Sequence, residues 1–64
     1  MKTVEMTELK KGDIFCHELK LRGREAFLVT EVNEKAIVCQ SRTSGDIMKK
    51  KREGRVTLLR HIDE

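Results

Sequence analysis

Residues 26–40 decide the fold of this chain, and they read AFLVTEVNEKAIVCQ. Residues 26–32 are mainly aliphatic, aromatic and β-branched, which favours an extended strand. Residues 36–39 are apolar at every position, as expected for a strand that is covered on both faces. Only three residues separate the two runs, and Asn33 among them is a common turn residue. The stretch therefore predicts a central β-hairpin.

Similar β-favouring runs recur on both sides of this hairpin, over residues 14–21, 47–52 and 55–62. The runs are separated by short segments of turn-forming residues, namely Gly12-Asp13, Arg22-Gly23-Arg24, Ser44-Gly45-Asp46 and Glu53-Gly54. Such turns are too short to hold a helical crossover between parallel strands. We therefore expect a mainly β fold, a small antiparallel barrel of five to six strands.

Each end of the chain is compatible with two structures. Residues 3–7 alternate polar and apolar side chains, which predicts a first strand that turns Val4 and Met6 inward. The same part of the chain also fits a short helical turn near residues 7–11. The last run fits a strand whose alternation breaks at Arg60, and a helix is the alternative because apolar residues also recur there at every third position.

The chain has 64 residues, which form a single domain over residues 1–64 and bury only about 60% of the surface of the unfolded chain. Such a domain has no room for a deep pocket enclosed by several layers, so we expect a non-catalytic protein without a cofactor. Its longest apolar runs have four residues, far short of the roughly 20 that span a bilayer, and no secretory segment opens the sequence. These features predict a cytoplasmic protein without a membrane partner.

Charge is distributed unevenly along the chain. Residues 1–39 carry seven basic and seven acidic side chains, so the net charge of +3 arises in the remaining part. Residues 47–60 hold six cations against Glu53 alone, and the six are Lys49, Lys50, Lys51, Arg52, Arg55 and Arg60. Clustered cations attract phosphate, because binding releases counterions that are condensed on a nucleic acid. These six residues form the predicted nucleic-acid-binding site.

The cationic run also has a purely structural interpretation. Its beginning, Ile47 and Met48, is the part that we expect to be buried, and the cations that follow must face water or an acidic partner. Lysines on such a strand commonly protect an exposed sheet edge from aggregation. The alternative to a binding site is therefore a solvated face.

Aromatic side chains are scarce, with two phenylalanines and no tryptophan or tyrosine. A small core needs both Phe15 and Phe27, so neither is left to stack on nucleic-acid bases or to line a polyproline groove. We therefore expect contact with DNA or RNA to be made through the phosphates, to tolerate any base sequence and to weaken strongly with salt.

A protein partner is the second hypothesis. So small a core gains stability when more apolar surface is buried in a homodimer or against a larger partner. The candidate contact residues are Met6, Met48, Leu19 and Leu21. In that case the chain is an interaction module or an accessory subunit.

Two cysteines and two histidines supply ligand types that zinc prefers, and they are Cys16, His17, Cys39 and His61. Their spacing disfavours a metal site, because zinc ligands usually occur in pairs separated by about two to five residues, whereas the first two here are adjacent and would point to opposite faces of a strand. The same argument applies to a cysteine–histidine nucleophile pair. We therefore predict no metal site, no catalytic residue, and reduced cysteines that are buried as small apolar residues.

Residues 9–15, which read LKKGDIF, show a resemblance to a known family. A leucine and lysines that lead through Gly12-Asp13 into an apolar strand resemble the opening of many SH3-like barrels, including translation and transcription modules of the KOW type. The segment is also similar to short barrel proteins encoded by bacteria and their phages. The chain departs from the KOW pattern, because it has only Gly23, among charged residues, where those modules have a second glycine-rich turn. The resemblance therefore implies an SH3-like barrel and no particular activity.

Overall fold

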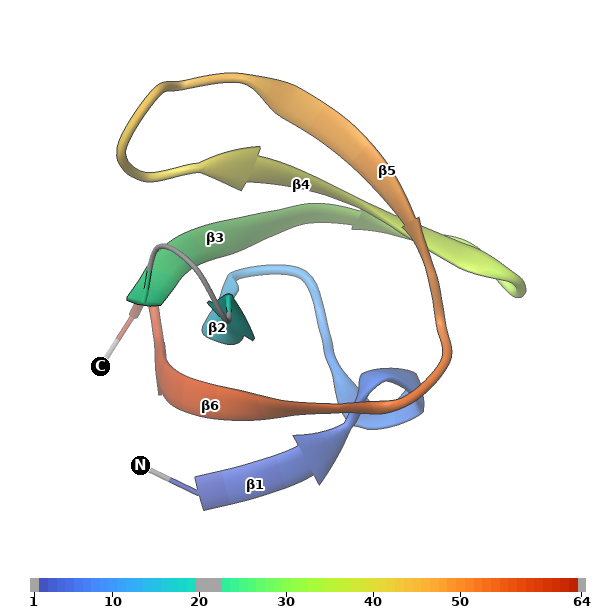
Figure 1. The fold of residues 1–64 in the computed structure, drawn as a ribbon. Coiled ribbons are helices and arrows are strands. Elements are labelled where there is room, and N and C mark those ends of the chain that lie inside the picture. The colour runs from blue at the N-terminus through green and yellow to red at the C-terminus, as the bar shows by residue number, and fades with distance from the viewer. Residues whose placement is uncertain (1, 20–22, 64) are drawn as a thin grey trace.

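The computed structural model describes the backbone of residues 2–19 and 23–63, and the side chains of residues 2–16 and 25–63. Six antiparallel strands form one sheet in the order β1-β6-β2-β3-β4-β5 (Figure 1). The elements are β1 (Lys2–Glu5), the 3₁₀ helix η1 (Met6–Glu8), β2 (Asp13–Leu19), β3 (Gly23–Val32), β4 (Ala36–Ser41), β5 (Ile47–Lys51) and β6 (Arg55–His61). The predicted mainly β fold with antiparallel strands is confirmed.

The sheet is curved but open. Its hydrogen-bonded order starts at β1 and ends at β5, and these two strands do not pair with each other. In Figure 1 the strands curl around, so that β5 and β1 lie on opposite sides of β2. The sequence predicted a closed barrel, whereas the described strands form a sheet with two edges.

The core is built around the two phenylalanines. Phe15 of β2 lies opposite Phe27 of β3, and the ring centroids are 5.6 Å apart. The other buried members of the cluster are Val4, Met6, Leu9, Val29, Ile37, Cys39 and Val56. Each large apolar side chain that is fully buried contributes about 1.5–3 kcal/mol. The prediction that both phenylalanines and both cysteines are buried is confirmed.

The segment before β2 combines both of the predicted structures. Val4 lies in the first strand and Met6 in the 3₁₀ helix, and both side chains are buried as expected. The helical turn ends before most of the expected residues 7–11. The Glu8 carboxylate stabilises the start of this turn by accepting a hydrogen bond from the Glu5 N–H at 2.9 Å.

The last run forms a strand, so the helical alternative is wrong. Its register against β2 shifts, because Leu58 pairs with Phe15 whereas Arg60 pairs with Ile14. Leu59 is therefore the extra residue of a β-bulge. The bulge explains why the sequence alternation breaks at Arg60.

The turn before β2 requires a glycine. Gly12 has a φ of +94°, and a Cβ atom there would lie 2.7 Å from His61 Nε2. Its N–H donates to the Val29 carbonyl at 2.9 Å, and its carbonyl accepts a hydrogen bond from the Ile62 N–H at 2.7 Å. This turn therefore joins the start of β2 to β3 and to the end of β6.

Candidate binding surface on strand β5

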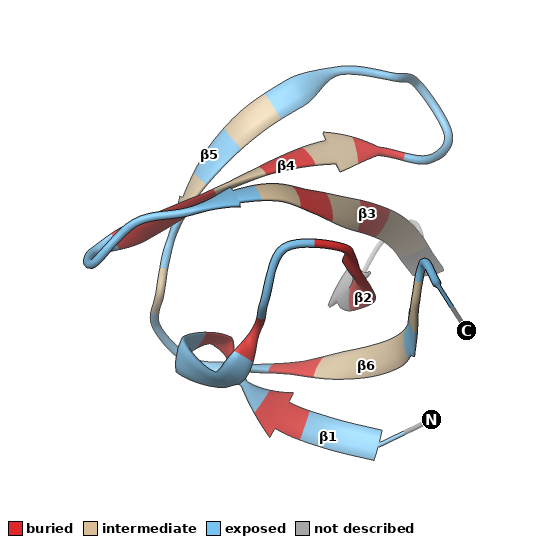
Figure 2. Cartoon of the chain, turned by 180° about the vertical axis from the view of Figure 1, so that it is seen from behind, coloured by how far each residue is buried: buried red, intermediate tan, exposed pale blue. Residues whose placement is uncertain are grey.

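Strand β5 is an edge of the sheet, and β4 is its only partner among the strands that the structure describes. Exposure alternates along it (Figure 2): Ile47, Lys49 and Lys51 are exposed, whereas Met48 and Lys50 are half-buried. Successive side chains of a strand point to opposite faces of the sheet. Strand β5 therefore turns three side chains outward and two side chains toward the core.

The backbone groups of β5 alternate in the same way. The Ser41 N–H donates to the Asp46 carbonyl at 2.8 Å, and the Arg52 N–H donates to the Lys35 carbonyl at 3.2 Å. In an antiparallel pair every second residue exchanges hydrogen bonds with its partner, so every second position from 46 onward bonds to β4. The positions between them, which carry the exposed side chains, direct their N–H and C=O groups to the edge along which no described strand pairs.

Lys49 and Lys51 lie on the outward face of β5, about 7 Å apart along the strand. Neither ammonium group pairs with a carboxylate among the residues that the structure describes. Glu34 and Glu53 line a shallow depression together with Lys51, whereas Lys49 lies opposite Val38. These two lysines are the part of the predicted site that the structure brings together.

Lys50 points toward the inner face instead. Its Nζ atom lies 4.8 Å from the centroid of the Phe27 ring, which is a cation–π contact. Burial raises the pKa of the nearby Cys39 thiol above its usual value of 9.0, and the charge of Lys50 opposes this rise. Lys50 therefore interacts with the core and is separated from its two neighbouring lysines.

Arg52 connects two distant parts of the chain. Its Nη1 donates to the Asn33 carbonyl at 3.0 Å, and its Nη2 donates to the Thr7 carbonyl. Its Nε atom is buried without a hydrogen-bond partner among the described residues. The guanidinium thus holds the β3–β4 turn against the 3₁₀ helix, and a phosphate would have to displace these contacts to reach it.

The two arginines of β6 lie on other parts of the sheet. Arg55 pairs with Glu5 of β1 and lines a shallow depression that Glu8 also lines. Arg60 pairs with Ile14 of β2, and both arginine side chains are exposed. Among the described strands β6 pairs with β1 and β2 and not with β5, and Lys50 and Arg52 make contacts within the protein, so the six predicted cations do not form one continuous surface.

Ile47 is an apolar residue of this surface that the sequence analysis missed. Its side chain is 70% exposed, whereas Met48 packs against the core as expected. The prediction that both are buried is wrong, because successive strand residues face opposite sides and the outward side of the edge strand β5 is not covered by the described residues. Alternation predicts that the two residues face opposite sides, but the sequence alone does not show which side is left uncovered.

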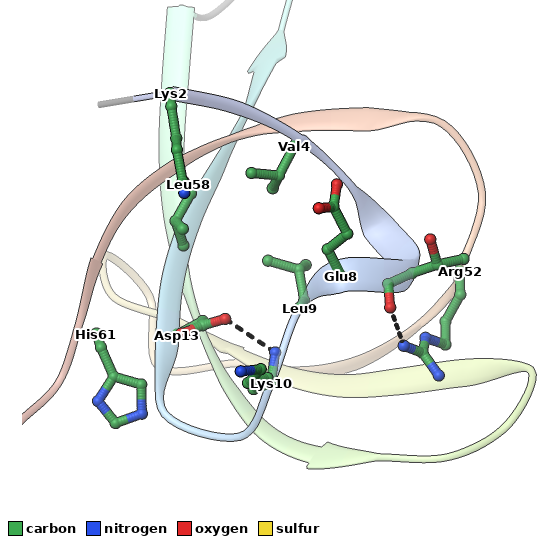
Figure 3. Close-up of a pocket in the computed structure, with 10 residues that line it drawn as sticks. Lys2, Val4, Glu8, Leu9, Lys10, Asp13, Arg52, Leu58 and His61 are labelled. Atoms are coloured by element: carbon green, nitrogen blue, oxygen red, sulfur yellow. Dashed lines mark hydrogen bonds between the residues drawn. The ribbon is translucent and has the colours of Figure 1, made fainter.

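Another hollow formed by described residues is a groove beside the 3₁₀ helix (Figure 3). Its apolar lining consists of Val4, Leu9 and Leu58. Its two carboxylates stabilise local structure, because Glu8 caps the helical turn and Asp13 accepts a hydrogen bond from the Lys10 N–H at 2.9 Å. The groove is therefore lined by charges of both signs and is less distinctly cationic than β5.

The described side chains of Cys16, Cys39 and His61 do not gather into one site. Cys16 lies on β2 and Cys39 on β4, with β3 between them, and both are buried free thiols. The His61 ring is occupied locally, with Nε2 at 3.1 Å from the Lys11 carbonyl. The side chain of His17 lies outside the described residues. Within the described part of the chain, no three potential metal ligands are grouped together.

The residues considered for a protein contact are not equally accessible. Met6 is 1% exposed, and Met48 is half-buried against the core. The side chain of Leu19 and the whole of Leu21 lie outside the described residues. Neither methionine therefore presents a large apolar surface.

Comparison with protein-family models, with curated proteins and with solved structures finds no match to this chain. Within residues 2–19 and 23–63, no helix has the length and the apolar character needed to cross a bilayer. The surface of β5 is therefore the main guide to function.

Proposed function

We propose that this protein is a non-catalytic binding module that contacts the phosphates of DNA or RNA through strand β5. The proposal rests on one observation: Lys49 and Lys51 are exposed on the same face of an edge strand and have no carboxylate partner among the described residues. The binding of exposed ammonium groups to phosphates is favourable, because it releases counterions that are condensed on the nucleic acid. The exposed Arg55 and Arg60 are candidates for additional contacts from β6.

Lys50 and Arg52 have a different role in this proposal. The first lies over the Phe27 ring, and the second bonds to two backbone carbonyls. Both contacts are made within the protein, so these residues stabilise the module. Of the four adjacent cations that the sequence predicted to bind phosphate, only Lys49 and Lys51 therefore belong to the proposed binding surface.

Binding of this kind depends on the nucleic-acid backbone and hardly on the bases. Phe15 and Phe27, the only aromatic residues of the chain, are 0% and 4% exposed. Base stacking on an exposed aromatic ring, worth about 1–3 kcal/mol per base, is thus not available. We expect weak, sequence-tolerant binding whose affinity falls steeply with salt.

The test is a fluorescence-anisotropy titration of labelled DNA and RNA oligonucleotides at several salt concentrations. The double variant Lys49→Gln/Lys51→Gln should bind more weakly, and for double-stranded DNA its slope of log K against log salt should be shallower by about 2, since each lost phosphate contact contributes roughly 0.9. The matched control is Lys10→Gln/Lys11→Gln, which removes the same charge from two other exposed positions.

Both double variants should melt within a few degrees of the parent, because exposed cations contribute little to stability. Equal slopes for the parent and the β5 variant would contradict the proposal. So would equal losses in the two double variants, since a general effect of net charge would then explain the binding.

We further propose that the fold belongs to the SH3-like barrels. Its support is a single curved antiparallel sheet, together with a glycine turn at Gly12 in the segment that resembles the opening of those barrels. An experimental structure of the chain tests this: SH3-like strand order and packing of the two sheet ends around one core are expected, and a flat sheet would contradict it.

A further inference from the structure

The edge of β5 presents hydrogen-bonding groups that phosphate binding by side chains does not use. Ile47, Lys49 and Lys51 direct their N–H and C=O groups away from β4, and among the described residues no strand pairs with that side. An extended chain laid along an exposed edge satisfies such groups by strand addition. We propose that β5 binds an acidic extended peptide as an additional antiparallel strand.

Charge and exposure select the kind of peptide. Directly opposed residues of an antiparallel pair have Cβ atoms about 4.5–5.5 Å apart, so opposite charges stabilise the pair and like charges destabilise it. Lys49 and Lys51 lack a carboxylate partner among the described residues, and they favour an acidic residue at each facing position. Ile47, which is 70% exposed, favours an apolar residue opposite it.

The register fixes the order of these residues in the peptide. All strand pairs of the sheet are antiparallel, so the same direction is assigned to the added strand. The first, third and fifth peptide residues then face Lys51, Lys49 and Ile47, and the pattern from the N-terminus is acidic, any, acidic, any, apolar. The second and fourth residues lie on the inner side, next to Lys50 and Met48.

A second copy of this chain is a poorer occupant of the edge. Antiparallel pairing of two β5 strands that uses all three outward positions places Lys49 opposite Lys49 and Lys51 opposite Ile47. The first pair opposes like charges, and the second pair leaves an ammonium group beside an apolar side chain. Lysines at such positions disfavour edge-to-edge association of identical chains, whereas they favour an acidic strand.

This inference rests in part on the proposed function, because both use Lys49 and Lys51, so that the peptide and the nucleic acid must compete. The two interactions differ in one requirement. Strand addition needs the backbone N–H groups of the edge, whereas phosphate contact needs the lysine side chains alone. Experiments that remove a backbone hydrogen bond and keep the lysine charges therefore show which of the two proposals fails.

The first experiment changes the peptide backbone and leaves every charge in place. The probe is a synthetic peptide of alternating glutamate and threonine that ends in valine and has blocked termini, titrated into ¹⁵N-labelled protein and followed by amide chemical shifts. N-methylation of the third residue removes a hydrogen bond to Lys49 and should weaken binding about tenfold. N-methylation of the fourth residue, whose N–H points away from β5, should change affinity less than about twofold.

The second experiment changes the protein edge. Ile47→Pro removes an outward N–H at the first residue of β5, where proline is tolerated, and leaves the charges unchanged. Ile47→Thr is the matched control, because it also loses the apolar side chain but keeps the N–H. Peptide binding should be about tenfold weaker in the proline variant than in the threonine variant, whereas DNA binding should be equal in the two.

The outcomes separate the proposals. Equal affinity of the two N-methylated peptides, or DNA binding without peptide binding, would overturn strand addition and leave the phosphate proposal standing. A dimer of the free protein that the peptide does not dissociate would assign the edge to a second copy and would also overturn the inference. Peptide binding that is weakened by N-methylation of the third peptide residue and by Ile47→Pro would support strand addition. If DNA binding in the same protein did not depend on Lys49 and Lys51, the phosphate proposal would be contradicted.

Discussion

Strands β4 and β5 are paired residue by residue, yet their surroundings are opposite. Strand β4 lies inside the sheet between β3 and β5, and Ile37 and Cys39 are completely buried. Their partners across the ladder, Lys50 and Met48, are only half-buried, because β5 is an edge. Figure 2 shows this contrast as an abrupt change in exposure between neighbouring strands.

This contrast indicates that β4 contributes mainly to the stability of the protein and the outward face of β5 mainly to binding. A residue of β4 is constrained by strands on both sides and by the core, so its replacement changes packing. An outward residue of β5 has neighbours on one side only, so its replacement changes the surface. We therefore expect substitutions in β4 to affect the free energy of unfolding and outward substitutions in β5 to affect affinity.

The largest effect is expected for Ile37→Ala in β4. The side chain is 0% exposed, and its truncation leaves a cavity in the core. The free energy of unfolding should fall by about 2–5 kcal/mol, measured by chemical denaturation. The paired control is Lys49→Ala in β5, which should change it by less than about 0.5 kcal/mol. Similar losses for the two variants would show that β5 is packed as tightly as β4.

A smaller effect is expected for Arg52→Gln, just after β5. This change removes the hydrogen bonds from the guanidinium to the Asn33 and Thr7 carbonyls, and it should cost about 1–2 kcal/mol, because the side chain is partly exposed. Arg55→Gln, with an exposed side chain on β6, is the control and should be nearly neutral. If both changes were neutral, the contacts of Arg52 would not hold the two segments together.

The third prediction concerns the pH dependence of stability and the buried Cys39 of β4, which lies opposite Met48 of β5. Burial raises the pKa of the Cys39 thiol above 9.0, so the folded protein keeps this proton when the unfolded chain releases it. Stability should therefore fall as the pH rises above about 9, by at most about 1.4 kcal/mol per pH unit from this group.

The measurement is the melting temperature against pH for the parent and for Cys39→Ala. The variant starts from a lower stability, since it leaves a small cavity, but its melting temperature should depend less on pH above 9. Parallel curves for the two proteins would contradict the assignment of this pH dependence to Cys39.

Most of the fold could be predicted from the sequence, because strands and turns leave local patterns. The hairpin of residues 26–40 is found where alternation and its turn indicated it, and the burial of Phe15 and Phe27 follows from their being the only aromatic residues. The break at Arg60 corresponds to a β-bulge. The order of the strands left no such local signal, so the unpaired edges at β1 and β5 could not be predicted.

The candidate site was predicted less well for the same reason. The sequence groups Lys49, Lys50 and Lys51 as neighbours, but alternation in a strand sends the middle one to the inner face. The role of Arg52 depends on Thr7, 45 residues away in the chain, and no local pattern indicates such a contact. The cations that remain together on the protein surface are thus Lys49 and Lys51, which lie two positions apart on one strand.

Amide hydrogen exchange of the free protein, followed by NMR, tests the central claim that β5 is an unpaired edge with alternating backbone groups. We expect slow exchange at the amides of Met48 and Lys50, fast exchange at those of Ile47, Lys49 and Lys51, and slow exchange throughout the neighbouring strand β4. Slow exchange at all five positions of β5 would show that its edge is already covered and would contradict the account, and fast exchange at all five would show that β5 is not paired with β4.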